Sequence, residues 1–301
     1  MSALGAPLLP LSSANLLGGT PVQQYWSAET GRTGRRDRLI RLAIAQRRRS
    51  IADVNHDEHC DALEVEIERF ASTFETADTG LRVPSCPDWS VEELALHLGT
   101  IHRWAQRLVV TRAPKRVSSA TMNLDLDPVD ATWLRRGGES LLATLRNADP
   151  DDSMWAWGVD QHVRFWSRRQ LHETLVHRID LELAIGAPWS VEPKVALDAI
   201  DELFQNLAPA GRFSPRVREL RGEGELLRFT SIDTSASWTV QLLPEGFAFV
   251  MSSDVPHVEL SGPAADLFGV LYRRQPLEGS DLQVVGHRPL LDFWLSNSAL
   301  E

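Results

Sequence analysis

The sequence predicts two folded domains, a four-helix bundle followed by a small α+β domain, after a basic N-terminal extension. Three observations lead to this prediction. Four amphipathic helical segments lie between residues 55 and 188, most with recognisable start or stop signals. Short strand-like segments alternate with helical ones between residues 189 and 301. Gly186 and Pro188 mark the break between the two patterns, because glycine commonly ends a helix and proline cannot continue one.

Residues 1–54 differ in composition from the rest of the chain. They contain eight arginines and three acidic residues, and they are rich in Gly, Pro, Ser and Ala. They lack the basic start and the long apolar run of a secretory signal. We interpret them as a disordered extension, or as sequence upstream of a translation start at Val54; a basic tail for a partner is the alternative.

The overall composition excludes several classes of protein. The chain has 301 residues, of which 43% are hydrophobic and 24% charged, as in ordinary globular proteins. A formal charge of −10 argues against nucleic acid or an anionic membrane as the main partner, and the longest apolar runs are too short to cross a bilayer. The two cysteines cannot form a disulfide framework, so a reducing, cytoplasmic setting is expected.

The first two helices of the bundle are announced by capping signals. Asn55 and Glu58 are spaced as a capping box, and apolar residues then recur at three- and four-residue steps. A turn is expected over residues 80–87. Ser90 and Glu93 form a second capping box, which starts the next helix.

The third helix is expected over residues 131–147 and the fourth over 164–185, after a polar stretch at 111–130. Four such helices with one long crossover make a bundle.

The domain after residue 188 is expected to begin with a helix over 192–208. Strand-like segments and two further helices follow. They are the strands Leu226–Ile232, Ser237–Leu243, Phe247–Met251, Val258–Leu260 and Leu282–Val285, with helices over 263–273 and 288–296.

His97 stands on the apolar stripe of the second helix, between Leu94 and Leu98. At that position it is expected to be buried, and a buried imidazole needs a hydrogen-bond partner or a metal ion. Taken alone, the position is more typical of a core histidine that is hydrogen-bonded.

The fourth helix contains the run HETLVH over residues 172–177, which has the wrong spacing for the zinc-protease motif H-E-x-x-H. His172 and His177 are five residues apart, and a helix places them about 140° from each other. Glu173 and His177 are four apart, about 40°, so they can converge on one ion. With His97 they would form a set of two nitrogens and one oxygen that leaves a coordination position open. Spacing alone does not distinguish this site from a solvated face shared with Arg169 and Asp180.

Four other residues could contribute chemistry. His172 is expected to pack in the core or to support the site from outside the ligand set. Asp180 either orients the His177 imidazole or pairs with Arg169 or Arg178. Cys86 is expected to be a buried structural thiol. Arg273 and Arg274 could hold a carboxylate, although a surface arginine pair is commoner.

Several segments together resemble the mycothiol-dependent maleylpyruvate isomerase family. They are VPSCPDWS at 83–90 continuing to His97, FWSRRQLHE at 165–173 continuing to Asp180, WTV at 238–240, LYRR at 271–274 and the segment 286–295. The resemblance covers residues 56–298. It implies a DinB-like four-helix domain followed by a C-terminal domain similar to sterol-carrier-type folds.

The resemblance also implies functional residues and cofactors. By the family's motifs, the metal ligands fall on His97, Glu173 and His177. The family's C-terminal arginine for substrate corresponds to Arg273 or Arg274. The implied cofactors are a divalent metal ion, zinc by its ligand set, and mycothiol as thiol cosubstrate.

The expected chemistry is activation of a thiol by the metal ion, followed by addition of the thiolate to an activated double bond. Elimination after bond rotation gives a cis–trans isomerase, and release of the adduct gives an S-transferase, in a pocket expected between the two domains. The partners are then a small electrophile and a low-molecular-weight thiol, with the chain as a monomer or homodimer. Two alternatives remain open: a metal-dependent hydrolase or amidase, and a non-catalytic protein that binds a metal and a ligand.

Overall fold

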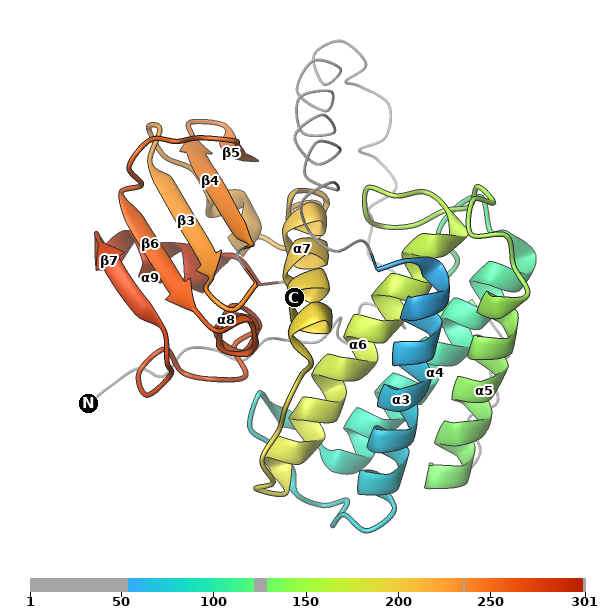
Figure 1. Ribbon diagram of the computed structural model, residues 1–301. Coiled ribbons are helices and arrows are strands. Elements are labelled where there is room, and N and C mark those ends of the chain that lie inside the picture. Colours follow the sequence, from blue (N-terminus) through green and yellow to red (C-terminus); the bar gives the residue numbers. More distant parts are fainter. Residues whose placement is uncertain (1–53, 122–128, 235, 300–301) are drawn as a thin grey trace. The chain divides into compact units, whose positions relative to one another are not determined.

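The computed structural model describes residues 54–121, 129–234 and 236–299. These residues form two compact units, one over Val54–Ser190 and one from Val191 onward (Figure 1). The prediction of a disordered extension lies outside the described residues. Within the described ranges, no helix has both the length and the apolar character needed to cross a bilayer.

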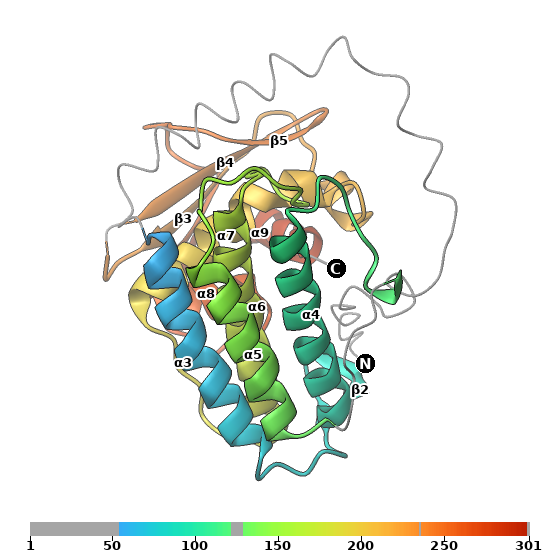
Figure 2. The same cartoon turned by 90° about the vertical axis from the view of Figure 1, so that its right-hand side faces the viewer.

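The first unit is the predicted bundle. Its α-helices are α3 (His56–Phe74), α4 (Val91–Thr111), α5 (Ala131–Arg146) and α6 (Val163–Ala184), with a short 3₁₀ turn, η1 (Ser119–Thr121). Both α3 and α4 pack against α5 and α6 (Figure 2). Helices α4 and α6 are therefore neighbours, and side chains on their facing surfaces can meet.

The predicted signals at the helix ends are present. The Asn55 carboxamide accepts a hydrogen bond from the Glu58 N–H at 3.0 Å, and the Glu58 carboxylate accepts one from the Asn55 N–H at 2.9 Å. Ser90 and Glu93 form the same reciprocal pair at the start of α4. At the end of α6, Gly186 has a φ of 70°, a left-handed conformation that glycine adopts without steric cost.

A small hairpin precedes α4, where the sequence predicted only a turn. Strand β1 (Arg82–Val83) pairs antiparallel with β2 (Cys86–Ser90). Two residues are too few to show an alternating pattern, and Pro87 argues against a strand, so no sequence signal was available. Val83 and Cys86 are buried, which fixes the hairpin to the bundle.

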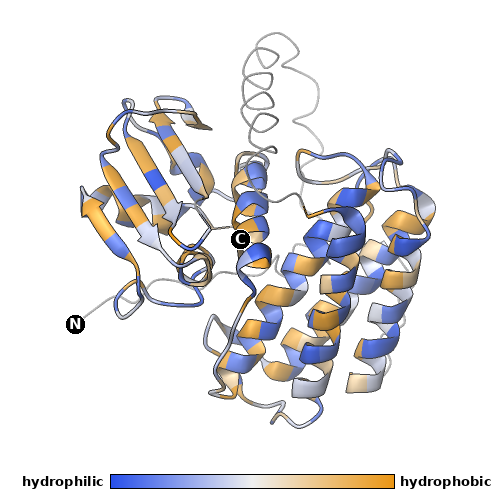
Figure 3. Ribbon diagram, in the orientation of Figure 1, coloured by the Kyte–Doolittle hydropathy of each residue, from blue (hydrophilic) through white to orange (hydrophobic). Residues whose placement is uncertain are grey.

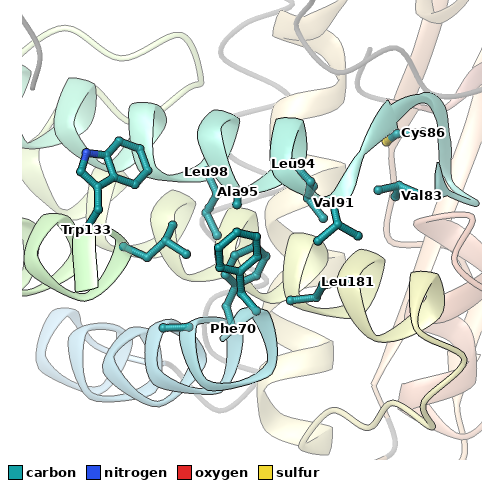
Figure 4. Close-up of a cluster of buried hydrophobic side chains, with 12 residues drawn as sticks. Phe70, Val83, Cys86, Val91, Leu94, Ala95, Leu98, Trp133 and Leu181 are labelled. Atoms are coloured by element: carbon teal, nitrogen blue, oxygen red, sulfur yellow. The ribbon is translucent and has the colours of Figure 1, made fainter. Parts of the chain in front are cut away.

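One core cluster joins the hairpin to all four helices (Figure 4). Trp89 packs against the edge of this cluster, next to the capping box of α4. The buried members are Phe70, Ala71, Phe74, Val83, Cys86, Val91, Leu94, Ala95, Leu98, Trp133, Leu134 and Leu181.

The second unit is the predicted α+β domain. Its sheet has the order β5-β4-β3-β6-β7, in which β3 and β6 are parallel and the other pairs antiparallel. Burial alternates along β6 and most of β3, as expected for strands with one covered face, and Figure 3 shows the hydropathy of the residues in the sheet. The strands are β3 (Leu226–Ser231), β4 (Ser237–Leu243), β5 (Gly246–Phe249), β6 (Val258–Gly262) and β7 (Gln283–Gly286). The helices are α7 (Pro193–Ala210), α8 (Ala264–Leu271) and α9 (Arg288–Asn297), with the 3₁₀ turn η2 (Arg216–Glu219).

Candidate metal centre

His97 lies on α4, close to the hairpin. Its ring centroid is 4.8 Å from that of Trp89, which β2 supplies. The side chain is only 9% exposed, so it is largely buried, as its place on the apolar stripe predicted. The imidazole therefore has little contact with solvent.

Glu173 and His177 lie one turn apart on α6 and meet His97 there. The Nε2 atom of His177 is 3.2 Å from Oε1 of Glu173, and Nε2 of His97 is 3.4 Å from the same oxygen. One possible ligand atom from each residue lies within 4.8 Å of the other two. His177 is buried, and the Glu173 side chain is 21% exposed. The alternative of a solvated face is therefore wrong.

The spacing of these three groups fits a divalent metal ion. Hydrogen bonds of the N–H···O type are usually 2.7–3.2 Å long, so the contact of His177 with Glu173 is at the upper end of this range and the contact of His97 lies slightly beyond it. Ligand atoms bound to a tetrahedral zinc ion at ~2.0–2.1 Å are about 3.3 Å from one another. The distances from Glu173 Oε1 to His97 and to His177, 3.4 and 3.2 Å, are close to that value. Two imidazoles and one carboxylate also form a ligand set that keeps one position open for water or substrate.

Charges around the site keep Glu173 ionised. Burial by itself raises the pKa of the Glu173 carboxyl, but the charge of Arg169 and hydrogen bonds with His177 and His97 outweigh burial and hold the pKa well below its usual range.

The two histidines differ in protonation. Burial lowers the pKa of His177, but hydrogen bonds with Asp180 and Glu173 overcome this effect and raise the pKa to about 9. Burial lowers the pKa of His97, with the hydrogen bond to Glu173 acting in the opposite direction. The metal-free site therefore holds a proton on His177 at neutral pH, and a metal ion must displace it.

Asp180 lies on the far side of the His177 ring. Its Oδ2 atom is 2.9 Å from Nδ1 of His177, and its Oδ1 atom accepts a hydrogen bond from the Ser85 hydroxyl. Asp180 is 0% exposed. Asp180 therefore contacts the imidazole, which is one of its two predicted roles. Arg178 binds the carboxylates of Glu66 and Glu182, and Arg169 binds that of Glu173.

Arg169 is a direct neighbour of the site, and the sequence did not predict its contact with Glu173. Its Nη2 atom is 2.7 Å from Oε2 of Glu173, and its side chain is 9% exposed. The guanidinium carbon lies 5.9 Å from the centre of the Trp157 ring. The spacing of Arg169 and Glu173 by four residues was visible in the sequence, but Arg169 was considered only as part of a solvated face or as a partner of Asp180. Ser85 was missed altogether, because nothing in the sequence joins it to α6.

His172 and the cysteines stay outside the three-residue set. His172 is fully buried, and its ring packs edge-on against His59 with centroids 6.4 Å apart, which confirms the prediction of a core residue. Cys86 is buried in the core cluster, as predicted. Cys60 is also buried, and burial raises the pKa of its thiol to about 11. Both cysteines are free thiols.

Arg273 and Arg274 follow α8 in the second unit. Arg273 has a φ of 60° and donates to the carbonyl of Leu295 at 2.5 Å. Arg274 is buried and donates to the carbonyl of Tyr272 at 2.7 Å. Both guanidinium groups thus contact backbone carbonyls, and a role in holding a substrate carboxylate stays a prediction.

Two protein-family models match the chain. The model for the mycothiol maleylpyruvate isomerase N-terminal domain matches residues 60–182. The model for the C-terminal domain of the same family matches residues 194–293. Together the two matches span more than half of the chain and nearly all of both structural units.

One solved structure supports the same fold, and a second is also similar to this chain. A crystal structure of the mycothiol-dependent maleylpyruvate isomerase is 14% identical in sequence, with a TM-score of 0.50, and the match covers 76% of this chain and 92% of that one. A histidine-to-alanine mutant of a mycothiol-dependent maleylpyruvate isomerase is 13% identical, with a TM-score of 0.49, covering 71% and 88%. No protein of curated function matches the chain in sequence.

Proposed function

Because this chain belongs to the mycothiol-dependent maleylpyruvate isomerase family, we propose that it is a metal-dependent enzyme that uses the mycothiol thiol to act on a small electrophile. The reaction is cis–trans isomerisation of a maleylpyruvate-like double bond, or transfer of the thiol to the electrophile. One observation carries the proposal: His97, Glu173 and His177 converge from two helices at the spacing of metal ligands.

Zinc is the proposed ion, because two imidazoles and one carboxylate are typical ligands of catalytic zinc. A bound divalent ion would lower the pKa of a thiol at the remaining open position, so that thiolate is available near neutral pH.

The protein's own groups favour an anionic thiolate at that position. Glu173 contributes one negative charge, and the two imidazoles are neutral ligands once His177 has lost its proton. A dication with this ligand set keeps a net positive charge. Arg169 adds to it, because its guanidinium lies against Oε2 of Glu173.

Two tryptophans border the site. Trp89 packs beside His97, and Trp157 lies close to Arg169, and both rings are half-buried. Apolar rings at these positions would limit the access of water to a bound thiol and would strengthen the electrostatic interactions there.

Arg273 or Arg274 is proposed to hold a carboxylate of the substrate. This assignment is supported by the match of the second unit to the family's C-terminal domain, on the segment LYRR at residues 271–274. A guanidinium group binds a carboxylate through two parallel hydrogen bonds.

The test is metal analysis of the purified protein combined with a thiol-dependence assay on a panel of electrophiles that includes maleylpyruvate. Turnover that requires both the metal ion and the thiol supports the proposal. Turnover that requires the metal ion but no thiol contradicts it in favour of a hydrolase. A stoichiometric metal ion without any turnover contradicts it in favour of a binding protein.

A further inference from the structure

We propose that Ser85 and Asp180 form a positioning chain that holds the His177 imidazole ready for a metal ion. This role rests on the proposed metal site and extends it to two residues that do not touch the ion. One of them comes from the hairpin before α4, so the chain links that hairpin to the metal site.

The first link joins Asp180 to His177 on α6. Oδ2 of Asp180 lies 2.9 Å from Nδ1 of His177, and the carboxylate is 0% exposed. A carboxylate at this distance keeps the ring hydrogen on Nδ1. The neutral imidazole must then present the lone pair of Nε2, which is the atom 3.2 Å from Glu173 Oε1.

The second link joins Ser85 to Asp180. The Ser85 hydroxyl donates to Oδ1, so the two oxygens of the carboxylate have different partners. These two hydrogen bonds fix the plane of the carboxylate, which one bond alone would leave free to rotate.

The backbone around Ser85 is itself anchored. Val83 and Cys86, on either side of Ser85, are buried in the core cluster, and β1 packs against α6. The hydroxyl is therefore presented to Asp180 by a fixed hairpin, as a positioning role requires.

Removal of such outer hydrogen-bond partners usually lowers metal affinity by about 10–100-fold. We expect a loss of that size in Asp180→Ala and a smaller loss in Ser85→Ala. Because Ser85 acts through Asp180, its loss should have little further effect once Asp180 is gone. Ser85→Thr keeps the hydroxyl and should retain the affinity.

The test is a double-mutant cycle on the full chain, with zinc affinity measured by competition against a chromophoric chelator. The proteins are wild type, Ser85→Ala, Asp180→Ala, the double variant and the control Ser85→Thr. Urea unfolding of each metal-free protein separates the loss of stability from the loss of affinity. If Asp180→Ala does not fold, Asp180→Asn replaces it, because it keeps the shape of the side chain and removes the charge.

Strong coupling between the two positions, with the affinity of Ser85→Thr preserved, supports the positioning chain. An equal loss from Ser85→Ala in both backgrounds overturns it, as does unchanged affinity in the Asp180 variant. If the wild-type protein binds no zinc, this role and the proposed metal-dependent function both fall. If the wild type binds zinc and the cycle shows no coupling, only the positioning chain falls.

Discussion

Binding of a divalent metal ion at pH 7 should release about one proton, and the proton should come from His177. In the metal-free protein, hydrogen bonds with Asp180 and Glu173 raise the pKa of His177 to about 9 despite burial. A metal ion bound to Nε2 of His177 would replace the hydrogen on that nitrogen, which points toward Glu173 in the metal-free protein.

The magnitude follows from the pKa of His177 and from the directions in which the pKa values of His97 and Glu173 are shifted. With a pKa about two units above the pH, His177 lacks its proton in roughly one molecule in a hundred at pH 7. The pKa of His97 and that of Glu173 are both lowered, so neither group holds a proton to release. The apparent dissociation constant for zinc should therefore fall about tenfold for each pH unit up to about 9 and then level off.

The same shift predicts how the stability of the metal-free protein depends on pH. A pKa raised from 6.5 to about 9 on folding stabilises the fold fully below pH 6.5. This contribution should be lost as the pH rises through about 9.

Isothermal titration calorimetry with zinc, in buffers of different ionisation enthalpy, measures the number of protons released. The slope of the binding heat against buffer enthalpy should correspond to about one proton at pH 7 and to much less above pH 9. Asp180→Asn is the control, because loss of its charge should lower the pKa of His177 and reduce the release. Zinc binding without proton release at pH 7, or with an affinity independent of pH, would refute this account of His177.

Three further predictions concern positions away from the His177 proton. His172→Ala should keep the metal ion and lose roughly 1–3 kcal/mol of stability in urea unfolding, because the ring is buried and turned away from the site; loss of the metal would contradict this. Gly99→Ala should destabilise the bundle by up to ~2 kcal/mol, because an added Cβ 2.0 Å from a ring carbon of Trp133 costs ~1–3 kcal/mol in overpacking and the gain in helix propensity offsets about 1 kcal/mol of that cost. An unchanged unfolding midpoint would disprove this prediction. Arg273→Ala or Arg274→Ala should weaken turnover and leave metal content unchanged, and unaltered kinetics in both single variants and the double variant would exclude the role.

The parts of the fold that depend on local chemistry could be predicted from the sequence. The capping boxes at Asn55 and Ser90 mark the starts of α3 and α4, and Gly186 marks the end of α6. The four-residue spacing of Glu173 and His177 was enough to place both groups on one side of α6, because helix geometry does not depend on the neighbours.

The environment of α6 could not be predicted in the same way. Periodicity identifies a buried face only when polar residues face solvent, and α6 is buried on nearly all sides. Its buried polar side chains form ion pairs and hydrogen bonds with each other and with residues distant in the sequence. Arg178, for example, forms ion pairs with Glu66 of α3 and with Glu182 of α6. For this reason the spacing alone left a metal site and a solvated face equally open.

The hairpin before α4 could not be predicted from the sequence either. A strand of two residues has no periodicity, so neither β1 nor the contact of Ser85 with Asp180 could be inferred before the chain was folded.

The most direct test of the metal site is the zinc content of Glu173→Ala, measured after dialysis beside the wild type and His172→Ala. Glu173 is the residue that both histidines of the site contact, and three protein ligands leave no redundancy. We predict about one zinc ion per chain in the wild type and in His172→Ala, and much less than one in Glu173→Ala. Stoichiometric zinc in Glu173→Ala would contradict the assignment of the metal centre.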